Sequence, residues 1–115
     1  MRDPRERLRD ILEAISAIER HGNCDRMTFE NDELRQGWFV RHLQIIGEAA
    51  QALPEEIRAL APEIPWREIV GMRNVLVHGY FEIDADIVWD AAKRDLPPLK
   101  AAVERLLAKL DRTEA

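Results

Sequence analysis

The chain has 115 residues, a formal net charge of −5 and a single cysteine. A chain of this length is expected to fold as one domain around one core. The acidic balance argues against a protein held on nucleic acid mainly by broad phosphate contacts, because such proteins are usually basic. One cysteine, Cys24, excludes an internal disulfide and any multi-cysteine zinc site. No run approaches the roughly 18 uncharged residues of a membrane span, so we expect a cytoplasmic protein.

The spacing of the apolar residues predicts an all-α bundle of four to five helices that occupies residues 1–115. Apolar side chains recur every three or four positions, and no alternation long enough for a strand is found. The predicted helices run from Pro4 to a stop at Gly22, from about Asn31 to Leu53, from Pro54 to Ala61, from Trp66 to Gly79, and from about Ala85 to Arg94, with a continuation from Leu99 onward. Cys24 to Glu30 is expected to be a connector, Pro97-Pro98 to kink or restart the chain, and the tail from about 112 to fray.

Two helices carry informative local signals. In the first, Asp3 is the expected N-cap, with Pro4 at the first helical position and Glu6 completing a capping box. In the second, Gly47 costs about 1 kcal/mol relative to alanine in a helix interior, so we expect neighbouring backbone to fill the space beside it. The bundle also has more apolar helix surface than it needs, including Trp38, Phe39 and the arc around Gly47, which predicts a homodimer through helix faces.

Polar side chains are concentrated in one apolar stretch of eight residues. Arg73, Asn74, His78 and Tyr80 lie within it. Desolvating such groups is costly unless they have partners, so the cluster indicates a functional site. On a helix, Asn74 and His78 would be neighbours on one face, and Arg73 and Tyr80 would share the adjacent face. A glycine at the C-cap, Gly79, would end that helix beside His78.

Each of these residues also has a structural interpretation. Arg73 could form an ion pair inside the bundle, for instance with Glu48, and Asn74 could cap a helix or face solvent. His78 could sit at a helix end, and Tyr80 could pack with its hydroxyl in water.

The remaining histidines and tryptophans are expected to be structural. His42 is interpreted as a core or interface histidine and His21 as a helix cap, with tryptophans 38, 66 and 89 as core or interface anchors. No histidine pair has metal-ligand spacing on one element, so neither a metal site nor a cofactor is predicted.

Taken in order, an arginine, four residues, a histidine, one residue and a tyrosine resemble the motif of the HepT-like ribonuclease toxins of the HEPN superfamily. The likeness extends over roughly residues 5–110. It includes Ile45-Ile46-Gly47-Glu48-Ala49, Ile64-Pro65-Trp66-Arg67-Glu68-Ile69, Gly71-Met72-Arg73-Asn74 and the segment from Ile87-Val88-Trp89 to Asp95-Leu96-Pro97.

The resemblance implies a HEPN-like fold and a metal-independent endoribonuclease toxin of a toxin-antitoxin pair. RNA supplies its own 2′-hydroxyl nucleophile, so His78 would act as general base or acid and Arg73 would neutralise charge on the phosphoryl oxygens. Asn74 would orient His78 or bond the phosphate. A homodimer would bring two motifs into one cleft.

The family also implies a partner, a minimal nucleotidyltransferase antitoxin that transfers AMP to the tyrosine, here Tyr80. The alternative is a non-catalytic helical dimer that binds a nucleotide or that partner, with the cluster used for phosphate contact alone. The RNA target, the cut-site preference and the physiological role, such as phage defence, are not determined by the sequence.

Overall fold

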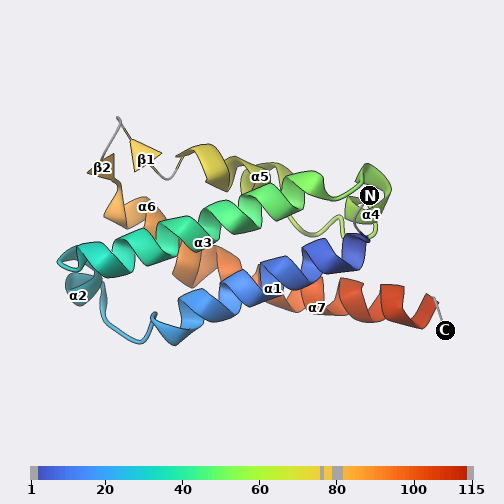
Figure 1. The fold of residues 1–115 in the computed structure, drawn as a ribbon, viewed down its shortest axis with the longest axis horizontal. Coiled ribbons are helices and arrows are strands. Elements are labelled where there is room, and N and C mark those ends of the chain that lie inside the picture. The colour runs from blue at the N-terminus through green and yellow to red at the C-terminus, as the bar shows by residue number, and fades with distance from the viewer. Residues whose placement is uncertain (1–2, 76, 79–81, 114–115) are drawn as a thin grey trace.

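The computed structural model describes residues 3–75, 77–78 and 82–113, with the backbone alone at 74, 75, 77, 78, 82 and 113. Most of it is helical, as predicted (Figure 1). The elements are α1 (Pro4–Arg20), α2 (Arg26–Glu30), α3 (Glu33–Ala52), α4 (Glu55–Arg58), α5 (Trp66–Val75), β1 (Val77–His78), β2 (Glu82–Ile83), α6 (Ala85–Asp90), the π-helical η1 (Ala91–Asp95) and α7 (Leu96–Thr113). Within the described ranges, β1 and β2 are the only strands.

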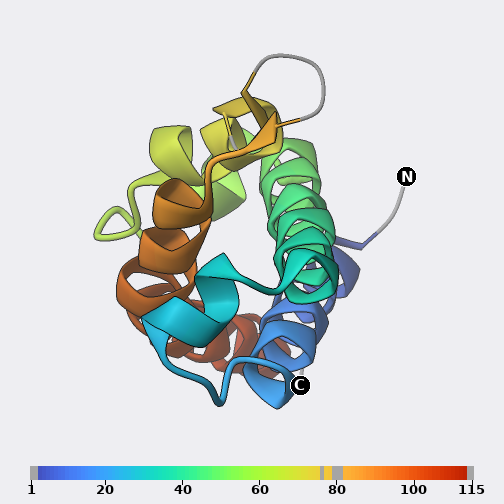
Figure 2. The same cartoon turned by 90° about the vertical axis from the view of Figure 1, so that its left-hand side faces the viewer.

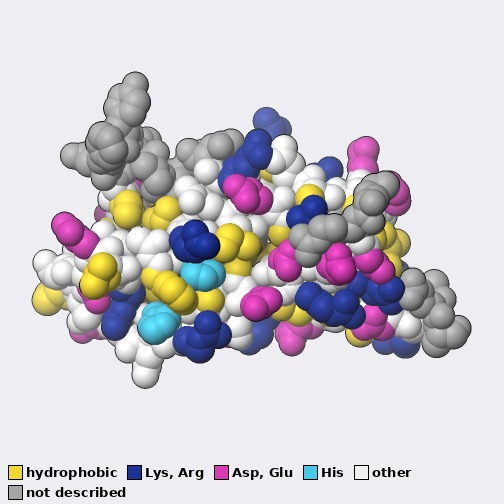
Figure 3. Space-filling model, viewed as in Figure 1, with side chains coloured by type: hydrophobic (Ala, Val, Ile, Leu, Met, Phe, Trp, Pro, Cys, Tyr) yellow, Lys and Arg dark blue, Asp and Glu magenta, His cyan; other side chains and the backbone are white. Residues whose placement is uncertain are grey.

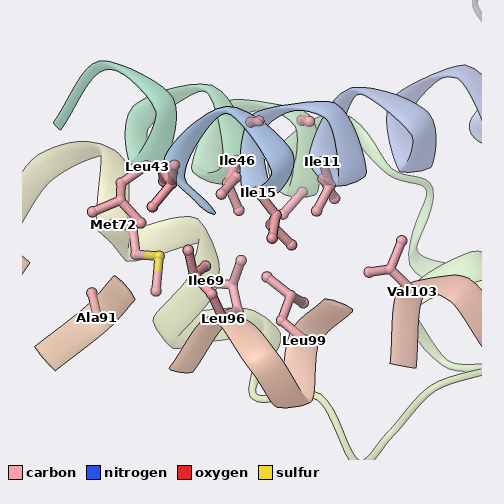
Figure 4. Packing of buried hydrophobic residues seen from close by; sticks show 14 of the residues in the cluster. Ile11, Ile15, Leu43, Ile46, Ile69, Met72, Ala91, Leu96, Leu99 and Val103 are labelled. Carbon is pink, nitrogen blue, oxygen red and sulfur yellow. The ribbon is translucent and has the colours of Figure 1, made fainter. Parts of the chain in front are cut away.

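Helix α3 is the central element of the bundle. It packs against α1 on one side and α5 on the other, while α7 covers α1 (Figures 1 and 2). Side chains from all four helices meet in one apolar core (Figure 4). Its fully buried members include Leu8, Ile11, Ile15, Phe29, Phe39, Leu43, Ile46, Leu53, Ile69, Val88 and Val103. The predicted single core is therefore present.

Aspartate caps fix where several helices begin. The Asp3 carboxylate accepts from the backbone N–H of Arg5, and Pro4 follows at the start of α1, as predicted. Asp32 caps α3 in the same way by accepting from Arg35. The predicted connector is partly wrong, because Asp25 accepts from the Thr28 N–H and nucleates the short helix α2.

Two consecutive prolines explain the π-helical turn between α6 and α7. Pro97 and Pro98 have no N–H, so the carbonyls of Lys93 and Arg94 lose the donors that an α-helix would supply. The chain widens instead, and the N–H of Leu96 bonds the carbonyl of Ala91, five residues back. The predicted restart is thus a continuous helix with one wide turn. Helix α7 then continues to Thr113, past the point where fraying was expected.

The expected dimer surface needs correction. Phe39 is completely buried and Gly47 lies under α5, so neither is available to a second copy. In the described ranges the large apolar side chains that are exposed include instead Leu34 at 90%, Met27 at 73% and Trp38 at 36%. None of the helices in the described ranges is both long and apolar enough to cross a membrane.

Candidate active site

Helix α5 is seated on α3 at a single glycine. A Cβ built on Gly47 would lie 3.0 Å from the backbone nitrogen of Arg73 and 3.2 Å from both the Arg73 Cβ and the Ile69 carbonyl oxygen. Such distances are shorter than most contacts that real Cβ atoms make, so any residue other than glycine would require α5 to shift by a few tenths of an ångström. The expectation that neighbouring backbone fills the space beside Gly47 is confirmed. The neighbour is the very segment that carries Arg73.

The start of α5 is fixed by Trp66. Its indole N–H donates to the carbonyls of Arg58 at 2.9 Å and Ala61 at 3.0 Å. Those carbonyls belong to α4 and the turn after it, so one half-buried ring joins the two short segments to α5. Trp66 is the predicted anchor, and its polar atom is satisfied by backbone rather than by a ligand.

The end of α5 differs from the prediction. The helix stops at Val75, and Val77 and His78 form β1, which pairs antiparallel with β2 so that Val77 lies opposite Ile83 and His78 opposite Glu82. Two β-branched valines near this point favour the extended chain over another helical turn. Asn74 and His78 are therefore not one turn apart on a shared helix, and that part of the spacing argument is wrong.

The structure describes only the backbone of Asn74 and His78. The predicted C-cap Gly79 and the predicted modification site Tyr80 lie outside the described residues.

Arg73 has a neutral partner, not the carboxylate of its alternative structural interpretation. Its guanidinium donates through Nη1 to the side-chain oxygen of Gln51 on α3, whereas Glu48 makes no ion pair with it among the described residues. The Nε atom of Arg73 is buried and has no hydrogen-bond partner in the same part of the chain. The site thus holds a cation that no described carboxylate neutralises, with one donor unused. That donor set suits a phosphate oxygen.

The strand that pairs with His78, β2, leads directly into α6. Asp84 follows β2 and caps α6 by accepting from the N–H groups of Asp86 and Ile87. The Arg26 guanidinium of α2 donates to Asp86 at 2.6 Å and lies 3.8 Å from Asp90. The hydrogen bond with Asp86 is the main cause that raises the Arg26 pKa above its ordinary value. Gln51 and Arg26 were not predicted from the sequence, because neither belongs to the local motif.

The other two histidines lie together on a different surface (Figure 3). The His21 and His42 rings flank Trp38, with centroids at 5.0 and 4.4 Å. The Trp38 indole donates to the Ala17 carbonyl at 2.8 Å, and His42 Nδ1 donates to the Trp38 carbonyl at 2.8 Å. His21 is the C-cap of α1, as predicted. His42 is satisfied but half-exposed, so it is not a core histidine, and its interpretation as an interface histidine stays a prediction.

Among the residues that the structure describes, no three histidine, cysteine, aspartate or glutamate side chains are grouped closely enough to hold a metal ion. Because the histidine of the motif is described only in its backbone, the absence of a metal stays a prediction.

The comparisons with known proteins agree on one family. A family model described as "Ribonuclease HepT-like" matches residues 11–106. A probable ribonuclease HepT of Thermococcus cleftensis is 41% identical over 108 residues, covering 91% of this chain and 96% of that protein. A putative RNase of Methanocaldococcus jannaschii is 39% identical over 104 residues, covering 90% and 95%. A putative RNase of Caldanaerobacter subterraneus subsp. tengcongensis is 38% identical over 110 residues, covering 95% and 98%. No solved structure gives a significant match.

Proposed function

The chain belongs to the ribonuclease HepT-like family and is a ribonuclease, and from that premise we propose that it is a metal-independent endoribonuclease toxin. In this proposal Arg73 and His78 are the catalytic residues and Asn74 supports them. RNA brings its own nucleophile, the 2′-hydroxyl, so cleavage needs proton transfer and charge neutralisation rather than a bound ion. Attack on the adjacent phosphate would release a 5′-hydroxyl and leave a 2′,3′-cyclic phosphate.

The observation that carries the proposal is the state of Arg73. Its guanidinium has a neutral partner, Gln51, and a buried Nε without one in the described part of the chain. An arginine with a structural role in a bundle is normally neutralised, because a half-buried charge is costly alone. Arg73 is instead left able to take a phosphate oxygen. The chain carries a net charge of −5, so RNA recognition would depend on such local cations.

The proposal includes a homodimer, and α3 supplies a surface suited to it. On the outer face of α3, six residues follow one another at alternating intervals of four and three positions. They are Leu34, Trp38, Arg41, Ile45, Glu48 and Ala52. This is the spacing of a two-helix seam. In an antiparallel pair with its axis midway between Arg41 and Glu48, each arginine would face the glutamate of the other copy. The same patch is then used by both copies, as two-fold symmetry requires.

This axis would also place two motifs close together. Measured along α3, Gly47 lies within one helical turn of the axis, and α5 rests on Gly47 with the backbone of Arg73. Each copy of Arg73 would therefore be near the two-fold axis. A shared cleft would supply two copies of His78, one for each of the acid and base roles that the reaction needs.

The test is cleavage of single-stranded RNA by the purified full chain in excess EDTA. We expect cleavage to persist, with cyclic-phosphate or 3′-phosphate ends. His78→Ala should abolish it while circular dichroism stays unchanged, and Gly37→Ala, an α3 substitution away from the motif, should leave it intact. Cleavage that disappears with EDTA and returns with Mg²⁺ would contradict the mechanism. Binding of RNA or nucleotide without any cleavage would support the non-catalytic alternative.

We further propose that a minimal nucleotidyltransferase antitoxin neutralises the toxin by transferring AMP to Tyr80. Tyr80 is two residues beyond His78 and seven beyond Arg73. A phosphodiester and a nucleoside added there would introduce negative charge and bulk close to the cation that the RNA phosphate requires. The proposed transfer of AMP to Tyr80 is supported by the position of this tyrosine in the motif with Arg73 and His78.

Co-expression with such an enzyme should raise the mass of the chain by one or more AMP units at Tyr80 and suppress cleavage. Tyr80→Phe should stay active and escape the modification. Toxin that is silenced while Tyr80 remains unmodified would show that the antitoxin acts by occluding the cleft instead.

A further inference from the structure

A groove runs along the face of α5 that does not contact α3. It separates α5 from α6, η1 and α7. Two adjoining hollows make it up, of about 450 and 370 Å³, and they share Pro65, Ile69, Arg94 and Asp95. Among the described side chains, Arg73 does not line it.

The floor of this groove is apolar. Buried core residues form it, with Ile69 and Met72 from α5 on one side and Ala91 and Leu99 from η1 and α7 on the other (Figure 4). Ile87, 37% exposed, lies at one end. Because the four floor side chains are already buried, the apolar surface left for a partner to cover is mainly that of Ile87 and of the exposed Pro65 and Pro98 on the walls.

The lip of the groove is acidic. Glu63 pairs with Arg105 at 3.3 Å, and Asp90 pairs with Arg94 at 3.2 Å, so both lip arginines are already matched. Two further carboxylates, Glu68 on α5 and Asp95 on η1, have no cation partner among the described residues. The groove therefore carries two uncompensated negative charges, one on each wall. A nucleic acid would be repelled from it.

We propose that this groove docks a basic amphipathic helix of a partner protein. An apolar stripe at i, i+4 and i+7 would fill the floor, and lysine or arginine side chains on its flanks would meet Glu68 and Asp95. Helix α5 is about 15 Å long at 1.5 Å per residue, so roughly ten to fourteen residues of partner helix would span the groove. The docked helix would pack on α5, on the face next to the one that contacts Gly47 of α3. This inference does not depend on the ribonuclease chemistry.

The probe is a pair of synthetic 14-residue helical peptides with the same leucine stripe, one flanked by lysines and one by glutamates. Their binding to the full chain is measured by fluorescence anisotropy at low salt. We expect the lysine peptide to bind at least tenfold more tightly. Glu68→Lys with Asp95→Lys should remove that preference, whereas Glu104→Lys, a charge reversal on α7 outside the groove and half as large in total, should keep it.

A second variant tests the apolar floor. Ala101 is exposed and lines one wall, so Ala101→Arg places a long side chain across the groove without disturbing the core. We expect it to weaken binding of the lysine peptide at least fivefold with unchanged circular dichroism. Equal affinity for both peptides, or equal losses in the lip variant and in Glu104→Lys, would overturn the proposal. So would a homodimer that Ala101→Arg converts to monomer, because the occupant would then be a second copy.

Discussion

Replacing Gly47 by alanine should destabilise the protein, although alanine is the better helix former. The added Cβ would lie 3.0 Å from the Arg73 backbone nitrogen and 3.2 Å from the Ile69 carbonyl oxygen, atoms that move only if α5 moves. Overpacking of this kind costs about 1–3 kcal/mol, against a gain of about 1 kcal/mol in helix propensity. The expected net loss is about 1 kcal/mol, which is roughly 4–8 °C in melting temperature.

The matched control lies on the same helix. A Cβ on Gly37 meets nothing within 4 Å, so Gly37→Ala should stabilise by about 0.5–1 kcal/mol. Because both variants make the same change in helix propensity, the difference in their free energies of unfolding measures the α3–α5 contact alone. Urea denaturation gives both values. If Gly47→Ala unfolds at the same urea concentration as Gly37→Ala, α5 does not rest on α3 as described.

Three further predictions follow from the site and the surface. Arg73→Lys should lower the cleavage rate by roughly 100-fold, because lysine keeps the charge but lacks the planar fork of donors. Gln51→Ala should lower the cleavage rate less, by about tenfold, because it removes only the side chain that holds the guanidinium. Sedimentation should show that Arg41→Glu weakens the dimer and that adding Glu48→Arg restores it; a double variant that stays monomeric would rule out this seam. The pKa of Asp3 is lowered to about 2, mainly by hydrogen bonds from the side chain of Arg5, so its stabilising effect should be complete above pH ~4 and lost as the pH falls through about 2. Melting temperatures of wild type and Asp3→Asn between pH 2 and 5 should show this as a difference that shrinks with acidification.

The helices were predictable from sequence where one strong local signal decided them. Asp3 and Pro4 predicted the start of α1, Pro54 predicted the end of α3, and Gly47 predicted a close backbone neighbour. The structure confirms all three. Each of these signals acts within a few residues of the chain.

The errors arose where distant residues decide the local conformation. The segment after Val75 could have continued as a helix by its own pattern, but pairing with Glu82 and Ile83 makes it a strand. A ladder of two residues has no detectable period in the sequence. In the same way Gln51, 22 positions before Arg73, is visible as its partner only once α5 has packed on α3.

The wide turn of η1 makes the chain sensitive to its own length. A π-helical turn holds one residue more than an α-helical turn, so deleting one residue of Ala91–Asp95 would join α6 to α7 without the wide turn, while Pro97 and Pro98 would still leave two carbonyls without donors. Every residue before the deletion would then rotate by about 100° relative to α7. Val88, fully buried, would turn out of the core, and Trp89 would leave its contact with Phe29. The extra residue of this turn therefore sets the rotation of α6 about its axis relative to α7. Removing it would lower the stability of the protein.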